Sequence, residues 1–323
     1  MTARIVLLVT SPRLPAGLLT AAAWDVVRAH PVFTAAESAQ VEALRASGVP
    51  VTVIDPDPER LLSEIGSGAV VWLGGPAGDL DFTRRLGLRL ANEPSLAELE
   101  LMYGSWDPPG ARLLDAVAVM DRLVSPGGDP WKRAQNHRTL APYLLEEAYE
   151  AVDAIESDDL DALREELGDV LLQIVLHARL AEELPEDERW NVDDVAGGLV
   201  DKMVRRNPHV FAGETVEGLE EITENWERIK KAEKSRDSAL DGIALGQPAL
   251  ALAAKILHRA ERAGLRVPLP ESADLGAALL RQVAASRAAG EDAEAVLRQA
   301  ALRYADDVRD AERNRRPGTA GRP

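Results

Sequence analysis

The stretch from about residue 111 to residue 312 constrains the fold most, because its sequence is helical almost throughout. Good helix formers dominate it, runs of β-branched residues are missing, and helix-breaking residues gather in short, separated groups. The pattern therefore predicts a mainly α fold built from a series of packed helices. The groups of breakers that separate these helices lie at residues 126–130, 157–159, 184–187, 207–213, 246–248 and 267–270.

The first 75 residues alternate short aliphatic runs with helical stretches. The runs Ile5–Val9, Val51–Ile54 and Val70–Leu73 have the length and composition of strands, which predicts a small α/β domain with a parallel sheet. Gly74-Gly75 follows the third run, and an ordinary turn is favoured there because no complete phosphate-binding motif occurs. Residues 77–110 are poorly periodic and are interpreted as a linker or a peripheral extension. The predicted helices of this part lie at residues 21–28, 38–46 and 58–65.

Acidic residues outnumber basic ones by 54 to 37, which gives a formal net charge of −17. Such a chain lacks the clustered cations that binding to a nucleic-acid polymer requires, so we expect no polymer partner. The absence of cysteine excludes disulfides, thiolate metal sites and a cysteine nucleophile. The aliphatic run Ile5–Val9 is too short for an export signal or a membrane span, so we expect a cytoplasmic protein without a membrane partner.

Two groups of carboxylates occur on consecutive predicted helices. Glu147 and Glu150 are three residues apart, as are Glu166 and Asp169, so each pair shares one face of its helix. Turn and N-cap residues at 157–159 separate the two helices, which predicts an antiparallel hairpin. Carboxylates that converge between two helices repel one another unless they are protonated, solvated or neutralised by a cation. A divalent ion, most often Mg²⁺, relieves this repulsion, but a solvated acidic helix face stays the alternative.

The sequence around these carboxylates resembles the MazG family of nucleoside triphosphate pyrophosphohydrolases. The pattern E-E-x-x-E is followed by E-x-x-D on the next helix, and Pro130-Trp131 with Gln135 and His137 precedes both. The resemblance covers about residues 120–265 in the same order. Further segments that fit the family are Leu140–Glu147, Glu166–Gln173, Asp201–Phe211 and Asn225–Lys230.

The resemblance implies an all-α, usually dimeric enzyme that hydrolyses nucleoside triphosphates to the monophosphate and pyrophosphate, in some members to clear non-standard or damaged nucleotides. It implies Mg²⁺ as the cofactor, with Mn²⁺ as a substitute, and a homodimer as the assembly. Glu146 or Glu150 is the candidate to orient or deprotonate the attacking water. The metal ligands that the resemblance implies are Glu147, Glu150, Glu166 and Asp169.

Four further residues match family positions that contact the substrate. Lys202 and Arg206 match positions that hold the triphosphate, and their cationic side chains suit that role. Trp226 and Lys230 match a later pair that contacts the nucleotide. Without the resemblance, the two cations would be interpreted as surface residues and the tryptophan as part of a core.

The segment after residue 245 is similar to a second, degenerate copy of the same domain. Glu271 and Asp274 repeat the E-x-x-D spacing, but no E-E-x-x-E helix precedes them, and Asp307 stands where a phosphate-binding arginine would be. We therefore expect a non-catalytic helical segment there. The expected organisation is a small α/β N-terminal domain of unknown role at 1–110, a MazG-like catalytic helical domain at 111–245, the degenerate helical segment at 246–314 and a disordered tail at 315–323.

Other interpretations remain open. A catalytically silent nucleotide-binding or protein-interaction scaffold would have the same fold, whereas a di-iron carboxylate bundle is disfavoured because no Glu-x-x-His pair accompanies the carboxylates. Trp131 is expected to be a packing anchor. Structural or hydrogen-bonding roles are expected for His137, His177 and His209, which lack metal-ligand spacing.

Overall fold

The computed structural model describes residues 3–65, 68–216, 218–233 and 237–315. The chain divides into two compact units, Met1–Gly198 and Leu199–Pro323, and each is described by itself. The predicted boundaries at residues 110 and 245 stay predictions. Of the predicted tail, residues 316–323 lie outside the described residues, and Arg315 is the last residue of a helix.

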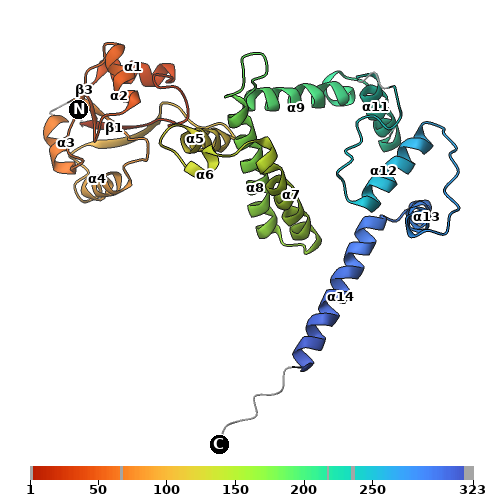
Figure 1. Ribbon diagram of the computed structural model, residues 1–323. Helices are drawn as coiled ribbons and strands as arrows, with labels where there is room; N and C mark the ends of the chain where they lie inside the picture. Colours follow the sequence, from red (N-terminus) through yellow and green to blue (C-terminus); the bar gives the residue numbers. More distant parts are fainter. Residues whose placement is uncertain (1–2, 66–67, 217, 234–236, 316–323) are drawn as a thin grey trace, which may run out of the picture. The chain divides into compact units, whose positions relative to one another are not determined.

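The first part of unit 1, drawn in red and orange in Figure 1, contains a five-stranded sheet. Its strand order is β3-β2-β4-β1-β5. Neighbouring strands are parallel, as the alternation of strands and helices predicts. Along the chain the elements are β1 (Arg4–Val9), α1 (Ala21–Ala29), β2 (Val32–Thr34), α2 (Ala39–Ala46), β3 (Val51–Val53), α3 (Pro58–Ile65), β4 (Ala69–Leu73), α4 (Leu80–Asn92) and β5 (Glu98–Tyr103).

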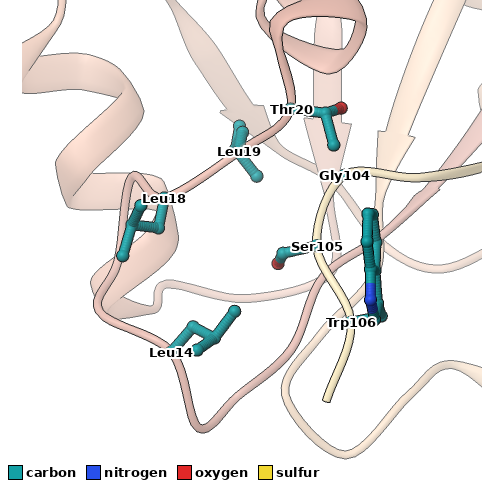
Figure 2. Close-up of a pocket in the computed structure, with 7 residues that line it drawn as sticks. All are labelled: Leu14, Leu18, Leu19, Thr20, Gly104, Ser105 and Trp106. Carbon is teal, nitrogen blue, oxygen red and sulfur yellow. The ribbon is translucent and has the colours of Figure 1, made fainter. Parts of the chain in front are cut away.

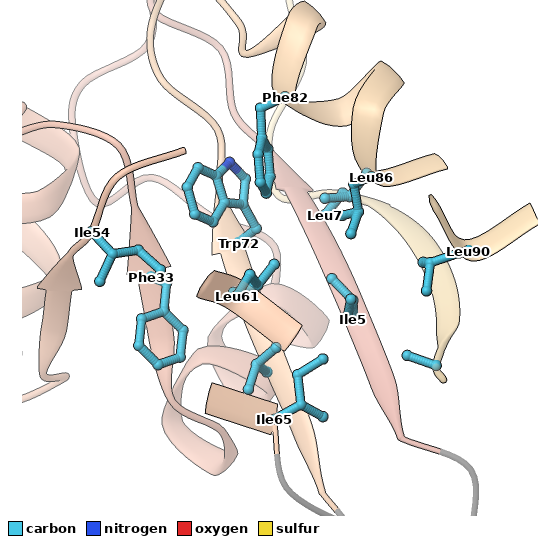
Figure 3. Packing of buried hydrophobic residues seen from close by; sticks show 12 residues of the cluster. Ile5, Leu7, Phe33, Ile54, Leu61, Ile65, Trp72, Phe82, Leu86 and Leu90 are labelled. Atoms are coloured by element: carbon cyan, nitrogen blue, oxygen red, sulfur yellow. The ribbon is translucent and has the colours of Figure 1, made fainter. Parts of the chain in front are cut away.

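Residues along each central strand alternate between two apolar clusters. Ile5 of β1 and Trp72 of β4 pack against α3 and α4, whereas Val6 of β1 and Leu73 of β4 pack against α1 and α2. Figure 3 shows the first cluster, in which the rings of Trp72 and Phe82 stack with their centroids 4.0 Å apart. Because helices cover both faces, the central strands bury successive side chains, which explains their continuous aliphatic runs.

The three predicted strands are confirmed as β1, β3 and β4, but the interpretation of residues 77–110 as a linker is wrong. This segment contains α4, which buries Phe82, Leu86 and Leu90 at a spacing of four residues, and the strand β5. β5 pairs with β1 and exposes much of its surface, so it has no aliphatic run that would mark a strand. β2 also escaped prediction because it is only three residues long.

The glycine loop after β4 forms an ordinary turn that one carboxylate closes. The indole Nε1–H of Trp72 donates to Asp79 Oδ2 at 2.8 Å, and the backbone N–H of Gly75 donates to the same oxygen at 3.2 Å. An acidic side chain therefore takes the N–H that a phosphate loop would offer to its ligand. The geometry agrees with the turn interpretation.

The helical part of unit 1 packs around a small apolar core. Met120 and Val124 of α5, Leu140 of α7, and Val175 and Leu176 of α8 are buried together in this core. The side chains thus come from three helices that are separated in the sequence by turns. The helices of this part are α5 (Arg112–Val124), α6 (Pro130–Arg133), α7 (His137–Glu156) and α8 (Leu160–Ala181), followed by α9 (Val192–Arg206).

Arg13 ties the α/β part of unit 1 to the first of these helices. Its Nε and Nη2 donate to the carboxylate of Asp115 on α5 at 2.9 and 2.6 Å, and its Nη1 pairs with Asp107. The hydrogen bonds from Arg13 lower the pKa of Asp115 below its usual range. A bidentate contact of this kind fixes α5 relative to the loop after β1.

All regular secondary structure among the described residues of unit 2 is helical. None of the described helices of the chain is both long enough and apolar enough to cross a membrane. Besides the last part of α9, the helices of unit 2 are α10 (Pro208–Phe211), α11 (Leu219–Ala232), α12 (Ala249–Arg262), α13 (Leu275–Ala288) and α14 (Ala293–Arg315).

Leu140→Ala is expected to destabilise unit 1 by about 2–5 kcal/mol, because it leaves a cavity among α5, α7 and α8. Leu140 is fully buried, whereas Leu113 on α5 is more than half exposed. Urea unfolding followed by circular dichroism measures the change, and Leu113→Ala is the control, with an expected change of less than about 0.5 kcal/mol. Equal losses in the two variants would contradict the assignment of this core.

Candidate functional site

The candidate site is built on the helical hairpin α7–α8, whose two helices lie side by side in Figure 1. Asn136 caps α7 and forms a capping box with Thr139. Asp159 caps α8 by accepting the backbone N–H groups of Asp161 and Ala162. The predicted turn between the helices is confirmed, and Asp158 within it has a positive φ of 55°.

Three carboxylates converge between the two helices. One oxygen each of Glu147, Glu150 and Glu166 lies within 4.8 Å of the others. Glu147 and Glu166 are half-buried, whereas Glu150 is exposed. The spacing of three residues places the first two on the face of α7 that meets α8, so the structure confirms that these predicted residues come together.

Burial and mutual repulsion change the acidity of this cluster. The pKa of Glu147 is raised by its burial, and further by the negative charges of Asp169 and Glu150. Burial also raises the pKa of Glu166, with Glu150 and Asp169 adding to the effect. Asp169 is therefore close enough to act electrostatically on both half-buried carboxylates. Glu146 is exposed and contributes a smaller effect on Glu147.

The donor set fits a hard divalent cation. All of the donor atoms are carboxylate oxygens, which Mg²⁺, Mn²⁺ and Ca²⁺ prefer over softer ligands. The raised pKa values of Glu147 and Glu166 mean that ionising both without a counter-charge costs free energy. A divalent cation between the helices offsets that cost, so the arrangement can hold a metal ion.

The residues expected to contact phosphates lie in unit 2. Lys202 and Arg206 are four residues apart on α9; Lys202 is half-buried, and the side chain of Arg206 is nearly buried. The guanidinium of Arg206 lies over the ring of Trp226, with its Cζ 5.2 Å from the ring centroid. The structure thus joins two of the predicted substrate residues in a cation–π contact. Lys230 lies one turn after Trp226 on α11.

One residue of this cluster was missed in the sequence. Glu233, directly after α11, accepts hydrogen bonds from both Arg205 and Arg206. These hydrogen bonds lower the pKa of Glu233 to about 2. Glu233 lies seven residues after Trp226, a spacing that keeps two residues on the same side of a helix. This spacing could have identified Glu233 from the sequence.

The structure also tests the roles predicted for Trp131 and for two of the histidines. His137 Nδ1 and His177 Nδ1 lie 2.7 Å apart, which confirms a hydrogen-bonding role for these two. Burial and His137 together lower the pKa of His177. Trp131 packs against Tyr143, whose ring it meets edge to face at 5.7 Å, although its side chain is about half exposed. The short helix α6 holds it outside the apolar core.

The Glu271/Asp274 pair differs from its proposed counterpart on α8. Asp274 is the N-cap of α13 and accepts the backbone N–H of Ala277 at 2.9 Å, and Glu271 lies before that helix. The two carboxylates therefore do not share a helix face, as Glu166 and Asp169 do. The interpretation of this segment as a degenerate repeat stays a prediction.

Unit 1 also has a shallow hollow near the carboxyl ends of β1 and β5, with a volume of about 230 Å³ (Figure 2). Its lining is mostly apolar and contains no titratable side chain, so it offers no acid, base or metal ligand. The residues that line it are Leu14, Leu18, Leu19, Thr20, Gly104, Ser105 and Trp106.

Comparison with known proteins gives consistent matches. The model of the MazG nucleotide pyrophosphohydrolase domain matches residues 135–211, which include the three clustered carboxylates. An uncharacterised 26.1 kDa protein of Streptomyces cacaoi is 49% identical over 219 residues, which cover 67% of this chain and 89% of that protein. The nucleoside triphosphate pyrophosphohydrolase of Mycolicibacterium smegmatis is 48% identical over 63% of this chain and 60% of the relative.

Other relatives, with lower sequence identity, match shorter parts of this chain. The nucleoside triphosphate pyrophosphohydrolase of Escherichia coli K12 is 43% identical over 46% of this chain and 57% of its own length. This chain therefore spans less than two thirds of the pyrophosphohydrolases from M. smegmatis and E. coli. The crystal structure of a MazG-related protein from Thermotoga maritima matches with 30% identity and a TM-score of 0.31, over 37% of this chain and 97% of that one. On the domain match and the relatives named nucleoside triphosphate pyrophosphohydrolase, the chain belongs to the MazG family of nucleotide pyrophosphohydrolases.

Proposed function

We propose that the protein hydrolyses nucleoside triphosphates to the nucleoside monophosphate and pyrophosphate in a Mg²⁺-dependent reaction. The observation that carries this proposal is the convergence of Glu147, Glu150 and Glu166 within the segment that matches the family model. Relatives named nucleoside triphosphate pyrophosphohydrolase, at 43–48% identity, support the reaction class.

The proposed metal ligands are the three clustered carboxylates together with Asp169. When bound, Mg²⁺ would neutralise phosphate charge and polarise the phosphoanhydride for attack by water. The protein's own carboxylates then have two tasks, which are to hold the ion and to orient or deprotonate the water. Glu146 and Glu150 are the candidates for the second task, because both are exposed beside the half-buried ligands.

The cationic residues are proposed to stabilise the phosphates. Phosphoryl transfer depends mainly on positioning and on neutralising charge, for which Lys202 supplies a point charge and Arg206 a bidentate fork. Trp226 and Lys230 are proposed to contact the substrate. The net charge of −17 makes such local cations necessary for binding a highly charged anion.

A homodimer is proposed as the assembly. Large apolar side chains on the hairpin, including Leu145, Ile155 and Leu167, are more than half exposed in the single chain. Exposed apolar side chains, where they form a continuous patch, are typical of interaction surfaces. Hydrolysis of damaged or non-standard nucleotides is a further proposal, which assays over a panel of standard and damaged triphosphates would test.

Glu150→Gln is expected to lower pyrophosphate release from a nucleoside triphosphate at least about hundredfold, because it removes a metal ligand and a candidate base while keeping the side-chain size. The assay separates pyrophosphate from orthophosphate. Glu156→Gln, which removes an exposed carboxylate at the end of the same helix, is the matched control with unchanged turnover. Wild-type turnover in Glu150→Gln would refute the assignment.

Mg²⁺ is expected to raise the melting temperature of the wild-type protein at pH 7, since a ligand at a hundredfold excess over its Kd contributes about 2.7 kcal/mol. Glu147→Gln should melt higher than wild type in a chelator and lose most of the Mg²⁺ effect. The pKa of Glu147 is raised in the folded protein, so its ionised form destabilises the fold above that pKa.

The raised pKa of Glu147 also determines how the stability difference between Glu147→Gln and wild type depends on pH. The advantage of Glu147→Gln in a chelator should shrink as the pH falls towards 4.5, the ordinary value for this carboxyl, because Glu147 is then mostly protonated in the folded chain and no longer repels its neighbours. Differential scanning fluorimetry across pH 4.5 to 8 measures this. A full Mg²⁺ effect in Glu147→Gln would contradict the metal site.

Lys202→Ala is expected to lower kcat/KM at least about tenfold, because a hydrogen bond to a charged group contributes about 1.5–3 kcal/mol. Steady-state kinetics with a nucleoside triphosphate and Mg²⁺ measure the change. Lys255→Ala on α12, which removes an exposed lysine, is the control for the change in net charge. Identical kinetics in Lys202→Ala and wild type would rule out a phosphate contact.

A further inference from the structure

Glu233 is bound to two arginines at the end of α9. The Nε–H of Arg205 donates to Glu233 Oε1 at 2.7 Å, and the Nη2–H of Arg206 donates to Glu233 Oε2 at 2.6 Å. The Nε–H of Arg206 donates to Oε2 as well, at 3.1 Å. The side chains of Arg206 and Glu233 are only 11% and 14% exposed, whereas that of Arg205 is 53% exposed.

The contact occupies one edge of the Arg206 guanidinium. Nε and Nη2 form one of the forks with which arginine binds either a carboxylate or a phosphate. The Cζ atom of the same guanidinium lies over the Trp226 ring, 5.2 Å from its centroid. Trp226 therefore restrains the position of Arg206, and Glu233 occupies the edge of the guanidinium that could otherwise bind a phosphate.

We propose that Glu233 competes with a substrate phosphate for this edge of Arg206, so that the triphosphate binds by displacing the carboxylate. The inference rests on the proposed function, since Arg206 is the residue proposed to hold the triphosphate. It adds a residue that sets substrate affinity through Arg206 and that the sequence did not reveal.

The charges favour displacement by an anion over release by a proton. Hydrogen bonds from Arg206 and Arg205 lower the pKa of Glu233 to about 2, so the carboxylate stays ionised at any pH at which the enzyme works. An anion with several charges, such as a triphosphate, forms a stronger contact with the guanidinium than a single carboxylate does.

Arg205 offers the displaced carboxylate another partner. Glu233 Oε1 already accepts from Arg205, so the carboxylate keeps one charged hydrogen bond after leaving Arg206. An unpaired and nearly buried carboxylate would be costly, and this second arginine removes most of that cost. The carboxylate thus keeps a charged partner when a phosphate takes its place on Arg206.

A purely structural role for Glu233 makes the opposite prediction. If Glu233 only orients Arg206, then removing its charge loosens the guanidinium and weakens phosphate binding. If Glu233 competes with the phosphate, removing its charge strengthens binding. The sign of the effect therefore separates the two roles.

Glu233→Gln in the full chain is the test, because glutamine keeps the size of the side chain and removes the charge. We expect KM for a nucleoside triphosphate with Mg²⁺ to fall about two- to tenfold, the factor that corresponds to one net hydrogen bond, with kcat not reduced. Glu294→Gln is the matched control, because Glu294 pairs with Arg298 at 3.2 Å in the same unit and is also partly buried. Its KM should stay at the wild-type value.

A binding measurement that needs no turnover keeps the inference separate from the proposed function. Isothermal titration calorimetry with inorganic tripolyphosphate and Mg²⁺ should show tighter binding by Glu233→Gln and weaker binding by Arg206→Gln than by wild type. If wild type releases no pyrophosphate but this order of affinities holds, the proposed function fails and the competition stands.

Three outcomes would overturn the competition. They are equal or weaker tripolyphosphate binding by Glu233→Gln, an equal gain in Glu294→Gln, and no detectable binding by either wild type or Glu233→Gln. Circular dichroism checks that each variant is folded, and Glu233→Ala, with the same expected direction, replaces Glu233→Gln if that variant does not fold.

Discussion

The packing of α7 against α8 is the constraint on which the candidate metal site depends. Leu140 and Leu176 are buried in one cluster with side chains of α5, which fixes how the two helices are aligned. This alignment forces Glu147 and Glu166 into half-buried positions beside other carboxylates, where the pKa of both rises. Burial of apolar surface thus holds together charges that repel one another. A divalent cation offsets the repulsion that the apolar packing imposes.

The α/β part of unit 1 contributes to this packing indirectly, through α5. Its sheet is stabilised by apolar clusters on both faces, and Arg13 links the loop after β1 to Asp115 at the start of α5. α5 in turn supplies Met120 and Val124 to the core beneath the hairpin. Through Arg13 and α5, the α/β part therefore contributes to the geometry of the helical part of unit 1.

The two charged clusters are stabilised in different ways. The three clustered carboxylates on α7 and α8 have no cationic side chain among the contacts described for them, and the pKa values of Glu147 and Glu166 are raised. In unit 2 the nearly buried guanidinium of Arg206 is matched by a carboxylate and an aromatic face, and the pKa of Glu233 falls. A cluster with a surplus of one charge is suited to take up an ion of the other sign. A cluster that is already paired exchanges its partner when an anion binds.

Much of the fold could be predicted from the sequence because local periodicity encodes it. The breaker groups marked most helix ends, and the aliphatic runs marked β1, β3 and β4. β1 and β4 carry such runs because their side chains are buried on both faces of the sheet. β2, β5 and α4 were missed for reasons of context. β2 is too short to show a pattern. β5 has no aliphatic run, and it is held in the sheet by its pairing with β1. α4 carries its three buried residues within a polar sequence.

The sequence by itself determined which residues share a helix face, because a spacing of three or four residues is fixed by helix geometry. That spacing alone was enough to pair Glu147 with Glu150, and Lys202 with Arg206. Only the tertiary structure decided which faces meet, because contacts between helices depend on apolar packing over long distances in the chain. That packing brought Glu166 to the other carboxylates. The arrangement of α9 and α11 within unit 2 brought Glu233, at the end of a different helix, to the arginines.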